Sequence, residues 1–151
     1  MKKSTYIAIS VGILSGLWGW ISGTLGLITW VGFIGCTSYY ASGGNLKGFK
    51  NSIYANMSGV LWAMAIILGS TYLGGSYWSY ILTGFFSFVM CYQANCKKLE
   101  FIPGAFCGCC CTFGTSGNWQ AVIIALICGA ILGYVSDKGG QISYGVFNKE
   151  A

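Results

Sequence analysis

The residues of this chain whose types could do chemistry are concentrated in the segment Cys107-Gly108-Cys109-Cys110-Cys111. On a helix, Cys107, Cys110 and Cys111 share one face, and Cys109 points away from it. Three thiolates on one face are soft ligands suited to Cu(I), Zn or an iron–sulfur cluster. The chain contains no His, however, and thiols in apolar helices also serve as small packing residues. We therefore expect packing and no bound cofactor, with a soft-metal carrier as an alternative.

The polar side chains within the apolar stretches are hydroxyl and amide groups without an ionisable neighbour. A proton relay or charge-coupled carrier places an ionisable residue inside the helix bundle, so this mechanism is disfavoured. No arrangement of nucleophile, base and orienting group is visible, and we expect no enzyme. Neutral polar groups suit a passage or pocket for a small uncharged solute. The candidate lining residues are Ser15, Trp18, Thr37, Ser38, Tyr39, Asn56, Trp62, Pro103, Gly104, Cys110 and Thr112.

The composition is that of an all-α integral membrane protein. Charged residues make up 7% of the 151 residues and hydrophobic residues 55%, whereas an ordinary soluble domain carries about 25% charged residues. The length is used almost entirely by six crossings, so we expect a single membrane domain with the lipid bilayer as its surroundings. The net charge of +5 comes from Lys residues between apolar stretches, which indicates a topology signal and no nucleic-acid partner.

All eight Lys residues can be assigned to one side of a membrane. Lys2 and Lys3 precede the first apolar stretch, and later pairs separate the second stretch from the third and the fourth from the fifth. Because short cytoplasmic loops are rich in Lys, this distribution predicts six crossings with both termini in the cytoplasm. The predicted crossings are residues 5–21, 25–42, 52–70, 76–94, 101–114 and 119–136, followed by a cytoplasmic tail over residues 137–151.

The fifth crossing is short. Fourteen residues of helix, from Phe101 to Gly114, reach about 21 Å, and the hydrocarbon core is roughly 30 Å thick. The only Pro of the chain, Pro103, marks a helix start or a break that opens backbone groups toward a cavity. We therefore expect a fifth helix that is short or broken, and the one-sided Lys pattern favours a full crossing.

An internal repeat is suggested by two segments that align without gaps. Residues 35–45 can be laid on residues 108–118, with Gly, Cys, Gly and Asn coinciding. The repeat would divide the domain into three-helix halves over residues 1–70 and 76–136. Since three crossings are odd, such halves would be inverted, as in many transporters and pores. A chain with 24 Gly and 8 Cys also produces coincidences of this kind, so a repeat and a chance match both stay open.

Several motifs resemble those of the YcdZ-like family of bacterial inner-membrane proteins. They cover nearly the whole chain and lie at Gly12–Trp20, Trp30–Thr37, Ser58–Ile67, Phe88–Ala94 and Ile102–Phe106. The resemblance implies a location in the bacterial inner membrane. It implies no substrate and no catalytic residues, because the family is a domain of unknown function.

The sequence therefore predicts an inner-membrane channel or facilitator for a small uncharged solute. Gly12 and Gly16 have the small-xxx-small spacing that allows close helix contacts, and Gly19 and Gly23 repeat it. Such faces serve either packing within one subunit or contacts between subunits, and we expect a homo-oligomer. The alternatives are a non-transporting membrane scaffold or partner subunit, and the soft-metal carrier.

Overall fold

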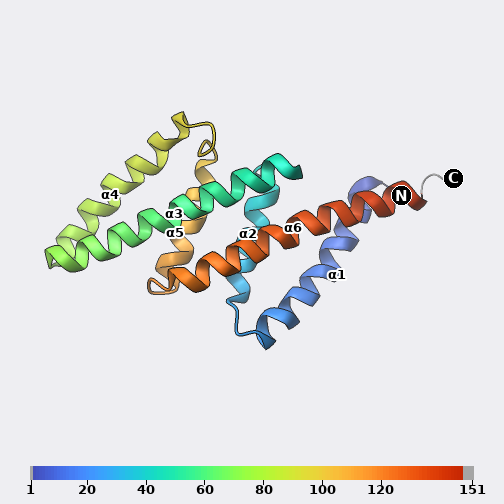
Figure 1. The fold of residues 1–151 in the computed structure, drawn as a ribbon, viewed down its shortest axis with the longest axis horizontal. Helices are drawn as coiled ribbons and strands as arrows, with labels where there is room; N and C mark the ends of the chain where they lie inside the picture. The colour runs from blue at the N-terminus through green and yellow to red at the C-terminus, as the bar shows by residue number, and fades with distance from the viewer. Residues whose placement is uncertain (1, 148–151) are drawn as a thin grey trace.

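The structure is a computed structural model that describes residues 2–147, and within this range the regular structure is entirely helical (Figure 1). The all-α architecture with six helices expected from the sequence is confirmed. A 3-10 turn, Gln93–Asn95, follows the fourth helix. The helices are α1 (Lys3–Thr24), α2 (Thr29–Ala41), α3 (Asn45–Leu73), α4 (Ser76–Tyr92), α5 (Ile102–Gly114) and α6 (Trp119–Phe147).

The helices differ in length more than hydropathy alone predicts. Both α3 and α6 have 29 residues, whereas α2 and α5 have 13 each. By length and composition α1, α3 and α6 are able to cross a membrane. The fifth helix is short, as expected, and Pro103 lies in its first turn, where a missing N–H costs little. The second helix is equally short because residues 25–28 form a turn before it.

The end of α6 also differs from the expected boundary. The hydropathy pattern ends the sixth crossing at residue 136, but the helix continues through Phe147. Gly139 and Gly140, which resemble a helix stop, lie inside it, and Gly140 packs against the backbone of Ile7 on α1. Asp137 is therefore a helical residue. Residues 148–151 of the predicted tail lie outside the described residues.

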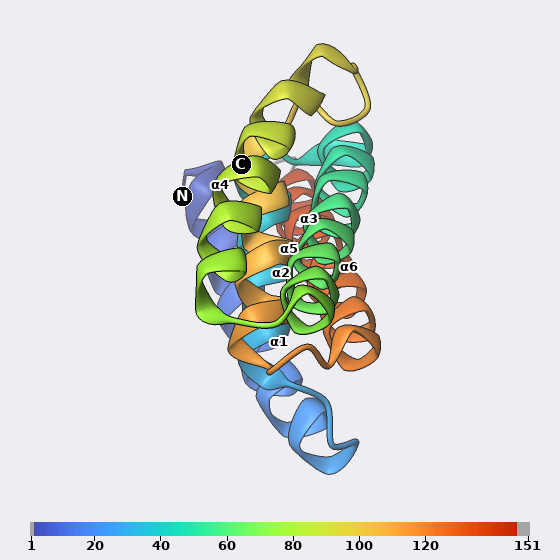
Figure 2. The ribbon, with the colours of Figure 1, turned by 90° about the vertical axis from the view of Figure 1, so that its left-hand side faces the viewer.

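The helices form two layers (Figure 2). The long helices α3 and α6 form one layer, and α1, α2, α4 and α5 form the other. The main contacts are exchanged between the halves of the chain, because α2 packs chiefly on α6 and α3 chiefly on α5. The outer helices follow the same rule, with α1 on α6 and α4 on α3.

The two halves run in opposite directions. In Figure 1, α1 descends where α4 ascends, and the pairs α2 and α5, and α3 and α6, are likewise antiparallel. The segments that carry Lys2, Lys3, Lys97 and Lys98 lie along the upper edge in this view, and the loops over residues 25–28 and 115–118 lie along the lower edge. This arrangement is that of an inverted repeat.

The burial pattern repeats between the two halves. Shifting α2 by 73 residues, from Val31 to Gly104, places all six of its buried residues on buried residues of α5. Seven buried residues of α3 fall on buried residues of α6 after a shift of 70 residues, from Ser52 to Val122. The gap-free alignment, with its shift of 73 residues, therefore relates α2 to α5. The long helices α3 and α6 are related by a shift of 70 residues, which differs by about one helical turn.

Glycine allows the halves to cross closely. A Cβ added at Gly59 would overlap the carbonyl oxygen of Ala105, and one added at Gly129 would overlap that of Gly32. These two contacts are equivalent under the repeat. Gly108 against the Asn56 carbonyl, and Gly35 against that of Leu126, form a second equivalent pair. Close backbone approach through small residues is the usual way for membrane helices to pack.

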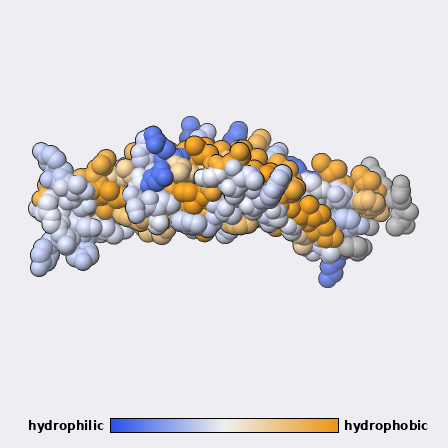
Figure 3. Space-filling view, turned by 90° about the horizontal axis from the view of Figure 1, so that it is seen from below, coloured by the Kyte–Doolittle hydropathy of each residue, from blue (hydrophilic) through white to orange (hydrophobic). Residues whose placement is uncertain are grey.

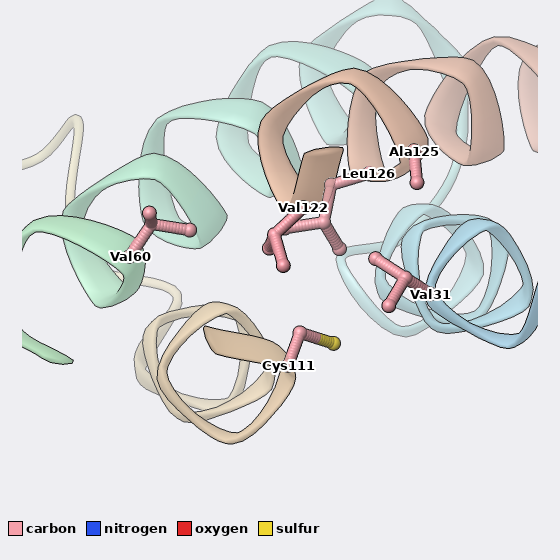
Figure 4. Packing of buried hydrophobic residues seen from close by; sticks show 6 residues of the cluster. All are labelled: Val31, Val60, Cys111, Val122, Ala125 and Leu126. Carbon is pink, nitrogen blue, oxygen red and sulfur yellow. The ribbon is translucent and has the colours of Figure 1, made fainter. Parts of the chain in front are cut away.

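The centre of the bundle is apolar (Figure 4). Its buried cluster brings together side chains from α2, α3, α5 and α6, and each of the four helices contributes to the same core. The cluster holds the crossing by dispersion and close packing. Its members are Val31, Val60, Cys111, Val122, Ala125 and Leu126.

Candidate functional site

The structure separates the candidate residues that the sequence suggested into inner and outer groups. Thr37, Pro103 and Cys110 are exposed on the outside of the bundle, and Ser15 and Trp62 are half-buried. The others are buried, but at different places in the fold, so the candidates do not line one continuous surface of a single chain. The buried members are Trp18, Ser38, Tyr39, Asn56, Gly104 and Thr112.

Ser38 and Asn56 form a buried polar pair at the crossing of the halves. The Ser38 hydroxyl donates to Asn56 Oδ1 over 2.8 Å, and both side chains are almost fully buried. Asn56 Nδ2 has no partner among the described residues. Under the repeat, Ser38 corresponds to Cys111 and Asn56 to Leu126, so the second half has an apolar pair in the same place. The polar pair is therefore not required by the packing of this fold.

A second polar group lies at the end of the bundle that carries Lys2 and Lys3. The Tyr39 hydroxyl donates to Asp137 Oδ2 over 2.8 Å, and the Gln141 amide donates to Oδ1 over 2.9 Å. Tyr39 is fully buried, and Asp137 is 7% exposed. Both of these donors are neutral, so they stabilise the carboxylate without neutralising its charge.

The loop between α2 and α3 covers this carboxylate. Gly43, Gly44 and Asn45 all have positive φ, at 93°, 65° and 56°. The amide of Gly44 donates to the Tyr39 carbonyl over 3.2 Å, and a Cβ added at Gly44 would lie 3.7 Å from Asp137 Oδ2. A non-glycine residue rarely adopts such φ values, so the sequence Gly-Gly-Asn permits the tight turn that places α3 beside the carboxylate.

A surface cavity of about 410 Å³ adjoins the Asp137 carboxylate. Lys3 lines it from α1, Tyr40 from α2, and Asp137 and Gln141 from α6. The Tyr40 hydroxyl oxygen is buried and has no hydrogen-bond partner among the described residues. A buried hydroxyl without a partner is unusual, because such groups are normally satisfied by protein or water.

Trp62 belongs to a different network, between α3 and the end of α4. Its indole N–H donates to Gln93 Oε1 over 2.9 Å, and the Gln93 amide donates to Ser58 Oγ over 3.0 Å. Trp18 has a comparable role between α1 and α2, where its indole N–H donates to the Thr29 carbonyl over 3.0 Å. Both Trp side chains thus fix neighbouring helices, and they lie on different sides of the bundle.

The cysteines of α5 lie on several faces of the helix. Cys109 and Cys111 are buried, Cys107 is half-buried, and Cys110 is exposed. All eight thiols of the chain are free. Within residues 2–147, no group of three or more His, Cys, Asp or Glu side chains is placed to share a metal ion.

Much of the surface is apolar. Figure 3 views the molecule from the lower edge of Figure 1 and shows mainly apolar and weakly polar residues. A surface cavity of about 480 Å³ between α3 and α6 is lined by apolar side chains that include Met57, Leu61 and Met64. Another, of about 310 Å³, lies between α1 and α6 and includes Leu17 and Leu132. Such surfaces suit lipid or a second apolar helix.

Sequence reasoning missed Asp137 and Gln141. The predicted cytoplasmic tail over residues 137–151 contains both of them. A signal was present, since Asp137 and Gln141 are four residues apart and therefore share a helix face. The small residue Gly133 lies one turn before Asp137, where it packs against Tyr39.

These features define a class: small multi-helix membrane proteins whose two halves are interlocked in opposite directions. Comparisons with known proteins identify the family. Residues 8–141 match the family described as protein of unknown function (DUF1097), and the chain belongs to this family. No solved structure matches it.

Its relatives include two inner membrane proteins named YcdZ, from Escherichia coli K12 and from Salmonella typhimurium LT2. Each is 46% identical over 136 residues, which cover 89% of this chain and 83% or 85% of the relative. The uncharacterized protein YahC of Escherichia coli K12 is 33% identical over 153 residues, which cover 93% of each chain. The relatives and the apolar helices together support a location in the inner membrane, and the family resemblance expected from the sequence is confirmed.

Proposed function

We propose that this protein is a non-enzymatic channel or facilitator for a small solute without net charge. The observation that carries the proposal is the buried Ser38–Asn56 pair, which lies where the inverted halves cross. Its counterpart, Cys111 and Leu126, shows that the fold can be built with apolar residues at this place. A hydroxyl and an amide kept in a membrane domain can replace part of the hydration of a neutral solute.

In this proposal, a homo-oligomer of the chain forms the passage. The glycines of α1 support it, because a Cβ added at Gly12, Gly16, Gly19 or Gly23 would meet nothing within 4 Å. They are therefore not used for packing within one chain, although their spacing is that of a helix–helix contact.

Osmotic swelling of proteoliposomes tests this function. Vesicles that contain the protein should swell faster than protein-free vesicles with at least one solute from a panel of urea, glycerol, acetamide and glycine. The matched variant is S38C/N56L, which gives the first half the residues of the second. We expect it to fold and to lose the added permeability. Swelling rates equal to those of empty vesicles for every solute would overturn the proposal and favour a non-transporting partner or scaffold.

A further inference from the structure

The cavity beside Asp137 is lined by groups of both charges, Lys3 and Asp137, and by Tyr40, whose buried hydroxyl has no partner among the described residues. We propose that it binds a small zwitterion with a primary ammonium group and a carboxylate, of the size of glycine or alanine. This inference rests on the proposed function and narrows the solute without net charge to one chemical class. The cavity volume of about 410 Å³ lies in the usual range for small-molecule sites, about 300–1,000 Å³.

The ammonium group is recognised by Asp137. This side chain is more than nine-tenths buried, and its two oxygens each accept one hydrogen bond, from Tyr39 and from Gln141. A carboxylate has about four acceptor positions, so it can still accept N–H groups from a ligand in the cavity. A charged N–H donor is the partner that such a buried carboxylate binds most strongly.

The Tyr40 hydroxyl supplies a second ligand contact. Tyr40 lines the same cavity, and its hydroxyl oxygen is buried and has no hydrogen-bond partner among the described residues. A hydroxyl both donates and accepts, so it can bind either end of a zwitterion. Because the fold makes no use of this hydroxyl, its removal tests ligand binding with little effect on the protein itself.

The carboxylate end of the ligand faces positive groups. Lys3 lines the cavity from α1, and Asn45, at the start of α3, lines it as well. The first turn of α3 has no side-chain cap, and the N-terminus of this 29-residue helix favours an anion. A bare cation would therefore be repelled by Lys3 and α3, and a bare anion by Asp137. A ligand with both charges satisfies each side.

Binding by the purified protein in detergent is measured by calorimetry. Glycine and L-alanine are the probes, and methylammonium chloride, sodium acetate and glycine betaine are the comparison solutes at matched ionic strength. We expect glycine or alanine to bind, and each comparison solute to bind at least about tenfold more weakly. Betaine carries both charges but lacks N–H donors, so equal binding of betaine would contradict the role of Asp137.

Three variants sharpen this test. D137N should weaken binding by at least about tenfold, and E100Q, which removes an exposed carboxylate from the loop after α4, should leave it unchanged. If D137N does not fold, Y40F decides, since it should still weaken binding about threefold or more. No binding of either zwitterion to the native protein, or unchanged binding in Y40F, would overturn the inference.

The swelling and binding experiments distinguish a failure of the proposed facilitator from a failure of the proposed zwitterion site. Zwitterion binding without faster swelling of proteoliposomes would support the site and contradict the facilitator. Faster swelling with urea or glycerol, but no zwitterion binding, would support the facilitator and contradict the site.

Discussion

The Tyr39 hydroxyl and the Asp137 carboxylate are joined by a hydrogen bond of 2.8 Å across 98 positions of the sequence. The contact ties α2 of the first half to α6 of the second, and it stands at the end of the bundle where the Gly43–Asn45 turn closes over it. It therefore links the two halves, and Asp137, its acceptor, lines the cavity beside it.

Replacement of Tyr39 by Phe should destabilise the protein by roughly 1.5–3 kcal/mol, because a buried carboxylate loses a hydrogen bond. Thermal unfolding in detergent can be followed with a dye that reacts with thiols as Cys36, Cys109 and Cys111 become exposed. The control is Y77F, since Tyr77 is 83% exposed. Equal unfolding temperatures for the two variants would contradict a stabilising role for the bond.

The Ser38–Asn56 pair should behave as a coupled unit. N56L leaves the Ser38 hydroxyl without its acceptor, and S38C leaves Asn56 without its donor, so each single variant should lose about 1–3 kcal/mol. The double variant S38C/N56L should lose less than the sum of the two, with a coupling of about 1–2 kcal/mol. Additive losses in the same unfolding assay would show that the two side chains act independently.

The sequence predicts the helical class and the order of the elements well, because six apolar stretches separated by charged or glycine-rich segments leave few alternatives. It locates α5 within one residue, helped by Pro103. It misplaces the start of α2, the start of α3, which lies at Asn45 instead of residue 52, and the end of α6. Hydropathy does not distinguish Leu25 in a turn from a helical Leu, or Gly140 in a helix contact from a helix stop.

The candidate site was predicted only in part. Ser38, Tyr39 and Asn56 could be found as polar residues in apolar stretches, but their partners come from other helices. Which residues meet depends on the packing of α3 against the second half and of α6 against the first. No local sequence pattern predicts this packing. Asp137 is the clearest example, because its burial depends on α2 and on the turn before α3.

Alanine in place of glycine should destabilise the protein where the two halves cross, but should not destabilise it on the outer face of α1. G59A and G129A place a methyl group against a carbonyl of the other half, and overpacking of this kind costs roughly 1–3 kcal/mol. G16A meets no atom and replaces a poor helix former, so it should be neutral or stabilise by up to about 1 kcal/mol. Similar unfolding temperatures for G59A and G16A would contradict the close crossing.

A larger side chain on α1 tests the homo-oligomer. G16L should fold, because the position is open in one chain, but it should reduce the mass of the assembly measured by light scattering in detergent. G84L is the matched control, since Gly84 is an equally open glycine on α4. An unchanged mass for G16L, or a native protein that is already monomeric, would contradict assembly through this face.

The orientation in the membrane can be tested with two thiols at opposite ends of the bundle. Cys96 is exposed in the Lys-bearing segment after α4, and Tyr72, near the end of α3, is 91% exposed. Because Lys-rich segments stay in the cytoplasm, an impermeant maleimide added outside the inner membrane should label a Y72C/C96S variant and spare Cys96 of the native protein. In inverted vesicles the native Cys96 should react, and C96S reports the background from other thiols. The opposite labelling would place the Lys-bearing end, and with it the cavity beside Asp137, outside the cytoplasm.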